Sequence, residues 1–171
     1  MRQRDKEMKL RKQQNGGIME IVCLDLEGVL VPEIWIAFAE ETGIPELKRT
    51  TRDEPDYDKL MKYRIGILKE HELGLKEIQE TIEKIDPLPG AKEFLDQLRS
   101  LTQVIIVSDT FSQFAGPLMK KLGYPTIFCN SLVVAPDGEI TDFKMRCEKS
   151  KYTTVKALQS IGYDTIASRS E

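Results

Sequence analysis

The sequence predicts an α/β protein with a doubly wound parallel sheet and an inserted helical cap. Two apolar, β-rich runs at 21–24 and 104–107 are too continuous for half-exposed strands and are typical of central parallel strands. Helical periods follow the second run and precede it, and this alternation indicates crossover connections. In addition, residues 33–85 contain three helical patterns and no strand pattern. The sheet and the all-helical insertion together define the predicted architecture.

The first predicted strand ends at Asp25, and the helical insertion follows it directly. Gly43 ends the first helical pattern, and Asp56 is a plausible N-cap for the second. We expect helices at 34–42, 56–70 and 75–85. Because a segment inserted at the carboxyl end of a strand lies over the ligand crevice of an α/β sheet, this insertion is placed to act as a lid. The expected units are a basic leader at 1–18, an α/β core at 19–32 and 87–171, and the cap at 33–86.

The second half of the chain alternates regularly between strand and helix. A helix at 91–101 precedes the strand at 104–107, and a helix at 111–122 is closed by Gly123. The remaining expected elements are short strands at 126–129 and 165–167, a hairpin formed by 132–134 and 140–143, and a last helix at 152–161. This order predicts a sheet with helices on both faces.

Composition excludes several classes of protein. The 171 residues carry a net charge of −3 and are 40% hydrophobic, which fits one globular domain with a real core. No run approaches the ~18 apolar residues of a membrane span. The three cysteines form no CxxC pair, so we expect reduced thiols and a cytoplasmic location. Residues 1–18 hold six Lys/Arg and two Asp/Glu; we favour a flexible extension over a nucleic-acid arm, because the rest of the chain is acidic.

Asp25 and Glu27 lie two residues apart where the first strand opens into a glycine-containing loop. In an extended segment both side chains point to the same side. Two neighbouring carboxylates repel each other, so such a pair is stable with a bound cation, a shared proton or divided roles as nucleophile and acid. Mg²⁺ is the cation that we expect, because it prefers oxygen ligands. The alternative is that Asp25 begins a turn and Glu27 is solvated.

Ser108, Asp109 and Thr110 follow the second strand and precede a helix. Backbone N–H groups at a helix start, together with a hydroxyl, make an anion site of modest strength. The alternative is an ordinary N-cap at Asp109 or Thr110. Because neighbouring parallel strands end at the same edge of a sheet, we expect these residues to approach the Asp25–Glu27 pair.

Cationic residues stand out at two further places, the start of the last predicted helix and position 64 of the cap. Lys149 and Lys151 lie at the start of the last helix, where a cation is disfavoured unless an anion is nearby, so one of the two is a candidate phosphate ligand. Spacing does not choose between them. Arg64 falls within an apolar helical stripe of the cap, where it either extends to solvent or meets an anion inside, such as a substrate carboxylate.

These motifs resemble those of a known family. Asp25-Leu26-Glu27-Gly28-Val29, the segment that continues to Glu33 and beyond, Ser108-Asp109-Thr110 and a late Lys151 are similar to the phosphoserine phosphatase branch of the haloacid dehalogenase superfamily. Glu as the second acid is most similar to the bifunctional phosphoserine:homoserine phosphotransferases. The resemblance extends from Met19 to about Ala167, and it implies a Rossmann-like core.

The resemblance also implies a role for each matching residue. Asp25 is the implied nucleophile, which forms an aspartyl phosphate, and Glu27 the implied acid and base. The resemblance implies that the Asp25 carboxylate and the Glu27 backbone carbonyl hold Mg²⁺. Ser108, Asp109 and Lys151 bind the phosphoryl group, whereas Glu33 and Arg64 bind the amino-acid part of O-phospho-L-serine. The expected partners are this substrate and homoserine as an acceptor, with no nucleic acid or membrane partner and with a homodimer left open.

The end of the chain departs from the family pattern. After Ser168 the family has Gly-Asp and a further Asp that complete the metal site, whereas this sequence has Arg169, Ser170 and Glu171. We therefore keep two alternatives to a phosphoserine phosphatase: a shortened relative that only binds phosphate or a phospho-amino acid, and a signalling receiver domain. A receiver domain would not contain a helical insertion of this size.

Overall fold

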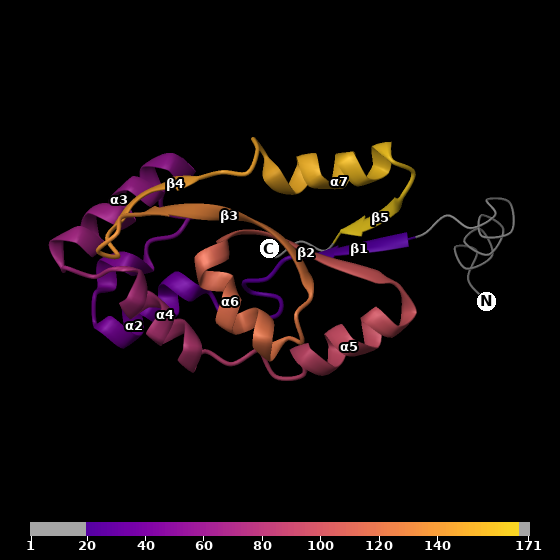
Figure 1. Cartoon of the computed structure of the whole chain (residues 1–171), viewed down its shortest axis with the longest axis horizontal. Helices are drawn as coiled ribbons and strands as arrows, with labels where there is room; N and C mark the ends of the chain where they lie inside the picture. Colours follow the sequence, from indigo (N-terminus) through magenta and orange to yellow (C-terminus); the bar gives the residue numbers. More distant parts are fainter. Residues whose placement is uncertain (1–19, 168–171) are drawn as a thin grey trace, which may run out of the picture.

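The computed structural model describes residues 20–167 and contains one five-stranded sheet (Figure 1). The strand order is β4-β3-β2-β1-β5, and every neighbouring pair is parallel except β3 and β4. The strands are β1 (Glu20–Leu24), β2 (Gln103–Phe111), β3 (Thr126–Val134), β4 (Ile140–Lys144) and β5 (Asp164–Ala167). The predicted fold class is thereby confirmed. The predicted leader at 1–18 lies outside the described residues.

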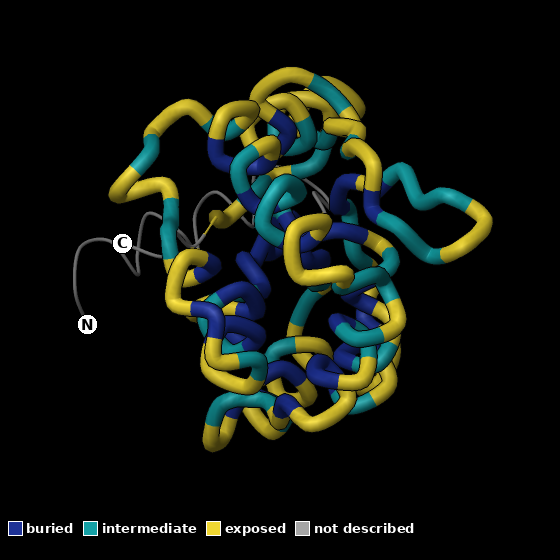
Figure 2. Tube along the Cα trace, turned by 90° about the vertical axis from the view of Figure 1, so that its left-hand side faces the viewer, coloured by how far each residue is buried: buried dark blue, intermediate teal, exposed yellow. Residues whose placement is uncertain are grey.

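Helices cover both faces of the sheet (Figure 1). They are α2 (Ile34–Thr42), the 3₁₀ helix η1 (Pro45–Lys48), α3 (Tyr57–Glu70), α4 (Leu75–Lys84), α5 (Ala91–Leu101), α6 (Ser112–Lys121) and α7 (Ser150–Ser160). Leu95 of α5 and Leu118 of α6 belong to the main core, whereas Cys23 and Val107 form a second cluster with Leu158 of α7. Burial of both strand faces explains the continuous apolar runs. Figure 2 shows the buried residues gathered inside, with helix surfaces exposed.

Two helix boundaries carry local signals that the sequence predicts. Gly43 adopts the left-handed conformation, with φ of 70°, directly after α2, and glycine does this without a Cβ penalty. The Asp56 side chain accepts hydrogen bonds from the amides of Asp58 and Lys59 at the start of α3. Both local signals are confirmed. Within the described residues, no helix is long and apolar enough to cross a membrane.

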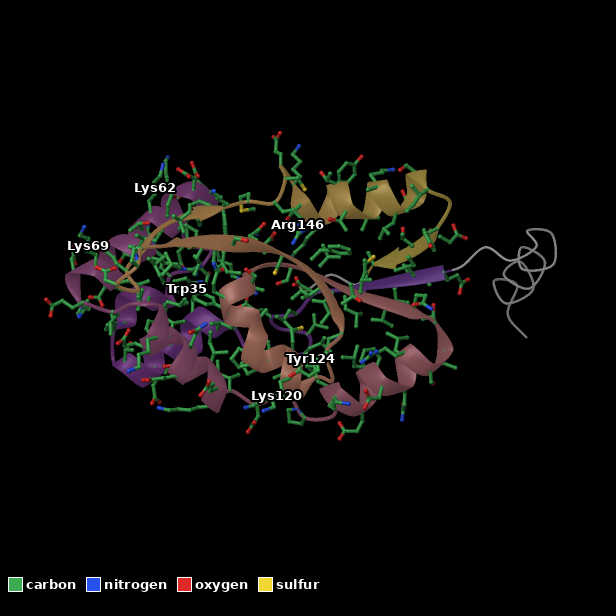
Figure 3. All side chains as sticks on the ribbon, in the orientation of Figure 1. Trp35, Lys62, Lys69, Lys120, Tyr124 and Arg146 are labelled. Atoms are coloured by element: carbon green, nitrogen blue, oxygen red, sulfur yellow. The ribbon has the colours of Figure 1, made fainter. Side chains whose placement is uncertain are left out.

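Helices α2 to α4, with η1, form a helical cap segment (residues 33–86) between β1 and α5. Trp35 packs edge-on against Phe114 of α6 at a ring-centroid distance of 5.7 Å, which joins this segment to the core. Figure 3 shows Trp35 inside and Lys62 and Lys69 on the outer surface. The limits of the cap as a domain stay a prediction.

The β3–β4 hairpin also contacts the cap segment. The amide of Leu75 donates to the Gly138 carbonyl at 2.9 Å, and Lys69 pairs with Glu139 at 3.1 Å. Gly74 lies so close that a Cβ there would come within 2.7 Å of the Gly138 oxygen. Glycine at position 74 thus permits the close approach between hairpin and cap.

Beyond shifts of one residue at element ends, four features differ from the prediction. Strand β2 runs on through Ser108–Thr110 to Phe111, since Phe111 still pairs with Asn130 of β3. β3 is one strand of nine residues rather than two short ones, and η1 was not predicted. Helix α7 begins at Ser150, two residues earlier than expected. The greater lengths of β2 and β3 depend on pairing with neighbouring strands rather than on local pattern.

Candidate active site

A cavity of about 640 Å³ lies where β1 and β2 end, between the core and the cap segment. All seven candidate site residues of the sequence line this cavity: Asp25, Glu27, Glu33, Arg64, Ser108, Asp109 and Lys151. The chain supplies them from the ends of both strands, from the cap segment and from the start of α7. The structure brings the candidates together, and their chemical roles stay predictions.

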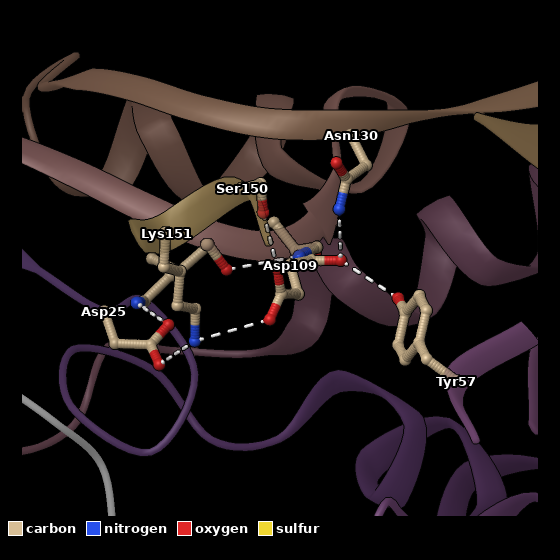
Figure 4. A network of polar contacts seen from close by, with 9 residues as sticks. Asp25, Tyr57, Asp109, Asn130, Ser150 and Lys151 are labelled. Atoms are coloured by element: carbon tan, nitrogen blue, oxygen red, sulfur yellow. Dashed lines mark hydrogen bonds and ion pairs between the residues drawn. The ribbon is translucent and has the colours of Figure 1, made fainter. Parts of the chain in front are cut away.

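Asp25 and Lys151, which both line this cavity, form an ion pair (Figure 4). The Lys151 Nζ lies 2.6 Å from Asp25 Oδ2, while Asp25 Oδ1 accepts a hydrogen bond from the Leu26 amide at 2.8 Å. Burial by itself would lower the pKa of Lys151, but the bond to Asp25 and the charges of Asp25 and Asp109 outweigh it and raise that pKa. Lys149 precedes α7 and does not line the cavity, so the structure brings Lys151 to the site.

The Glu27 carboxyl points toward the start of α2. Its Oε1 accepts a hydrogen bond from the Ile34 amide at 2.8 Å. Burial raises the pKa of Glu27 to about 7, the bond from Ile34 opposes this rise, and the charge of Asp25 adds to it. A carboxyl group with this pKa is present in both protonation states near neutral pH, which suits a group that must both give and take a proton.

The Glu27 pKa makes a prediction about folding stability. Because the folded-state pKa of about 7 lies above the ordinary 4.5, the folded protein holds a proton that the unfolded chain releases between these values. The contribution of Glu27 to stability is fully present below pH 4.5 and is lost as pH rises through 7. We therefore expect Glu27→Gln to be more stable than the parent at pH 8, by at most about 3 kcal/mol, and much closer to it at pH 4.5.

Urea unfolding of parent and variant at several pH values measures this difference. Glu93→Gln is the matched control, because Glu93 is exposed on α5. The Glu93 variant should track the parent at every pH. A Glu27 variant whose stability difference from the parent does not change with pH would contradict the raised pKa.

Arg64 is buried, so the alternative in which it extends to solvent is wrong. Its guanidinium lies over the Trp35 ring, 4.6 Å from the centroid, and Nη2 donates to the Arg49 carbonyl at 2.8 Å. Nε is buried and has no hydrogen-bond partner. Burial lowers the pKa of Arg64 to about 10, which leaves the group charged at neutral pH. A buried guanidinium in a cavity wall that also holds Glu33 suits a zwitterionic ligand.

The expected anion site at a helix start after Ser108 is not formed. Helix α6 begins at Ser112, and neither Asp109 nor Thr110 is its N-cap, because β2 continues to Phe111. Ser108 is buried and accepts a hydrogen bond from the Thr110 amide at 3.2 Å. The hydroxyl therefore still reaches the cavity, but from the end of a strand.

Several residues around the site were not singled out from the sequence. Tyr57 and the turn at 50–52 line the cavity, and Ser150 and Asn130 hydrogen-bond to Asp109. Tyr57 could have been found, because it lies seven residues before Arg64 and so shares its helix face. Ser150 and Asn130 carry no such signal.

Asp25 and Glu27 offer oxygen atoms, the kind of ligand that Mg²⁺ prefers. The described residues hold no cluster of three or more His, Cys, Asp or Glu suited to a metal ion. Mg²⁺ is commonly held by one or two carboxylates together with water and substrate phosphate, and not by an all-protein cage. The Asp25 carboxylate and the Glu27 backbone carbonyl, from two residues that line the cavity, would fit that mode of binding.

Comparison with solved structures defines the class of protein. A structure described as a phospho-aspartyl intermediate analogue of phosphoserine phosphatase superposes with a TM-score of 0.72 and 25% sequence identity. The match covers 88% of this chain and 78% of that chain. The fold found here, with its mainly parallel sheet, is therefore that of the phosphoserine phosphatases.

Sequence comparison gives the family. Phosphoserine phosphatase ThrH of Pseudomonas aeruginosa is 55% identical over 149 residues, covering 87% of this chain and 73% of the relative. A phosphoserine phosphatase of Pseudomonas syringae is 53% identical, and the chain spans 63% of its length. No protein-family model matches the chain. The chain belongs to the phosphoserine phosphatase family.

Proposed function

We propose that this protein is a Mg²⁺-dependent phosphoserine phosphatase that acts through an aspartyl phosphate on Asp25 and also transfers phosphate to homoserine. The observation that carries the proposal is the Asp25–Lys151 pair, with a contact of 2.6 Å, in a cavity that also holds Glu27 and Arg64. Family membership at 55% identity to a named phosphoserine phosphatase supports the substrate.

In the proposed first half-reaction, an Asp25 carboxylate oxygen attacks phosphorus and the bond from phosphorus to the serine oxygen breaks. Glu27 donates its proton to the departing oxygen, which leaves as the serine hydroxyl. A pKa of about 7 keeps a large share of Glu27 protonated at neutral pH. The covalent intermediate divides one difficult transfer into two easier ones.

In the second half-reaction, water attacks the phosphorus of the aspartyl phosphate and Glu27 takes the proton. The bond from phosphorus to Asp25 breaks, orthophosphate leaves and the carboxylate is restored. Homoserine can replace water, because its hydroxyl presents the same proton to Glu27. A cap that limits access of bulk water extends the life of the phosphoenzyme and favours this transfer.

Substrate binding is assigned to charges in the cavity wall. We propose that Arg64 binds the substrate carboxylate and Glu33 its ammonium group. Ser108 and Lys151 bind the phosphoryl oxygens. A carboxylate repels a phosphoryl dianion, so any contact of Asp109 with phosphate uses its amide N–H.

The metal is assigned to the same end of the cavity. Asp25, through its carboxylate, and Glu27, through its backbone carbonyl, would hold Mg²⁺. The bound ion would neutralise negative charge on the phosphoryl group. A cytoplasmic location, a place in amino-acid biosynthesis and a homodimer complete the proposal, and light scattering tests the last of these.

The direct test is release of orthophosphate from O-phospho-L-serine, with and without Mg²⁺ and with and without homoserine. We expect turnover that requires Mg²⁺, and phosphohomoserine as an added product when homoserine is present. Binding of phosphoserine without any turnover would instead support the alternative of a phosphate-binding relative. Turnover without phosphohomoserine would reject the transfer reaction alone.

A further inference from the structure

Two carboxylates face the Lys151 ammonium group from different strands (Figure 4). The Lys151 Nζ lies 2.6 Å from Asp25 Oδ2 and 3.6 Å from Asp109 Oδ2. Asp25 follows β1 and Asp109 lies near the end of β2, so the lysine bridges the ends of two neighbouring strands. The lysine thus has a second anionic partner beside the proposed nucleophile.

Asp109 is held in place by contacts from three elements. The Ser150 hydroxyl donates to its Oδ1 at 3.0 Å, and Ser150 is the first residue of α7, next to Lys151. The Asp109 backbone carbonyl accepts from Asn130 Nδ2 of β3 at 3.2 Å and from the Tyr57 hydroxyl of α3 at 3.1 Å. Tyr57 belongs to the cap segment, so this carbonyl joins cap and core at the edge of the cavity.

Asn130 is itself fixed. It is 1% exposed, and its Oδ1 accepts a hydrogen bond from the Arg146 amide at 3.0 Å. With both ends of the Asn130 amide engaged, its bond to the Asp109 carbonyl has a defined direction. The backbone and the carboxylate of Asp109 are therefore both oriented, which is what a group that must place another side chain requires.

The Asp25–Lys151 pair poses a problem for nucleophilic attack. Asp25 Oδ1 accepts from the Leu26 amide and Oδ2 contacts Lys151, so both oxygens have partners. When a bond forms between Asp25 and phosphorus, the carboxylate loses its charge and the ammonium must turn to the phosphoryl oxygens. A second carboxylate within 4 Å would keep the ammonium in the cavity during that exchange.

We propose that Asp109 is a positioning residue that retains the Lys151 ammonium group at the phosphoryl site when Asp25 loses its negative charge. Tyr57 supports Asp109 from the cap segment. The part of this inference that concerns phosphoryl transfer rests on the proposed function. The placement of Lys151 by Asp109 does not, and it is tested without substrate.

The substrate-free test measures the reactivity of Lys151 toward limiting acetic anhydride by mass spectrometry. Asp25→Asn removes the negative charge of the Asp25 side chain and leaves the Asp109 carboxylate, whose Oδ2 lies 3.6 Å from the Lys151 Nζ. We expect Lys151 to react little more in Asp25→Asn than in the parent, and at least about threefold more in Asp25→Asn/Asp109→Asn, because an ammonium group that no carboxylate holds in the cavity wall is more accessible to the reagent. Lys156, on the same helix and exposed, is the internal control. Equal Lys151 reactivity in both variants overturns the proposal.

The second test is a double-mutant cycle on phosphoserine turnover. We expect Asp109→Asn to lower kcat about tenfold with little change in KM, and to have no further effect in a Lys151→Met background. Tyr57→Phe, which keeps the ring, should lower kcat less. Independent, additive losses from Asp109→Asn and Lys151→Met would indicate a merely structural role and would overturn the proposal. A parent without turnover rejects the proposed function, and the acetylation result then still decides whether Asp109 places Lys151.

Discussion

Replacing Asp25 with Asn is expected to lower phosphoserine turnover by at least about a thousandfold, because an amide oxygen is too weak a nucleophile to form the covalent intermediate. The variant keeps the size of the side chain and an oxygen that can accept the Leu26 amide bond. The parent, quenched in acid during turnover, should carry the added mass of one phosphoryl group on the peptide that contains residue 25. The variant should carry none.

Asp96→Asn provides the matched control for this experiment. Asp96 is exposed on α5, outside the residues that line the cavity, and pairs with Lys92. Its variant should have parental activity, since a surface ion pair contributes little. If Asp25→Asn hydrolysed phosphoserine as fast as the parent, or if the phosphoryl group were found on another residue, Asp25 would not be the nucleophile.

Replacing Arg64 with Met is expected to lower kcat/KM for phosphoserine about 100-fold while leaving that for phosphoethanolamine nearly unchanged. Phosphoethanolamine has the ammonium and phosphate groups but lacks the carboxylate that Arg64 is proposed to bind. Methionine preserves part of the packing against Trp35, over which the guanidinium lies. The ratio of the two kcat/KM values therefore isolates recognition of the carboxylate.

Arg99→Met serves as the control, because Arg99 is exposed and donates to the Gly123 carbonyl away from the cavity. It should leave both substrates unaffected. A parallel loss for phosphoserine and phosphoethanolamine in Arg64→Met would show that Arg64 supports the cap segment through Trp35 and the Arg49 carbonyl. Carboxylate recognition would then belong to another residue.

Much of the fold could be predicted because its signals are local. The apolar runs of β1 and β2 and the left-handed Gly43 each depend on a few neighbouring residues. The end of β2 was wrong because its last residues stay extended by pairing Phe111 with Asn130, a contact that local periodicity does not contain. The 3₁₀ turn after α2 likewise has no apolar period of its own.

The site was predictable where the chemistry of a residue conflicts with its surroundings. A cation at a helix start and Arg64 in an apolar stripe are both such conflicts, and the structure places Arg64 and Lys151 at the cavity. The choice of Lys151 over Lys149 depends on where α7 begins. Ser150 and Asn130 are ordinary polar residues in sequence, and their bonds to Asp109 join positions 41 and 21 residues apart.

The hairpin that touches the cap has a consequence for how substrate enters. Besides its chain connections to β1 and α5, the cap segment is fastened by Leu75 to Gly138 and by Lys69 to Glu139. These contacts with the hairpin oppose a swing of the cap segment about one hinge, because they would have to break each time the cap opened. We therefore expect a ligand to enter beside the turn at 50–52, which lines the cavity, without a swing of the whole cap segment.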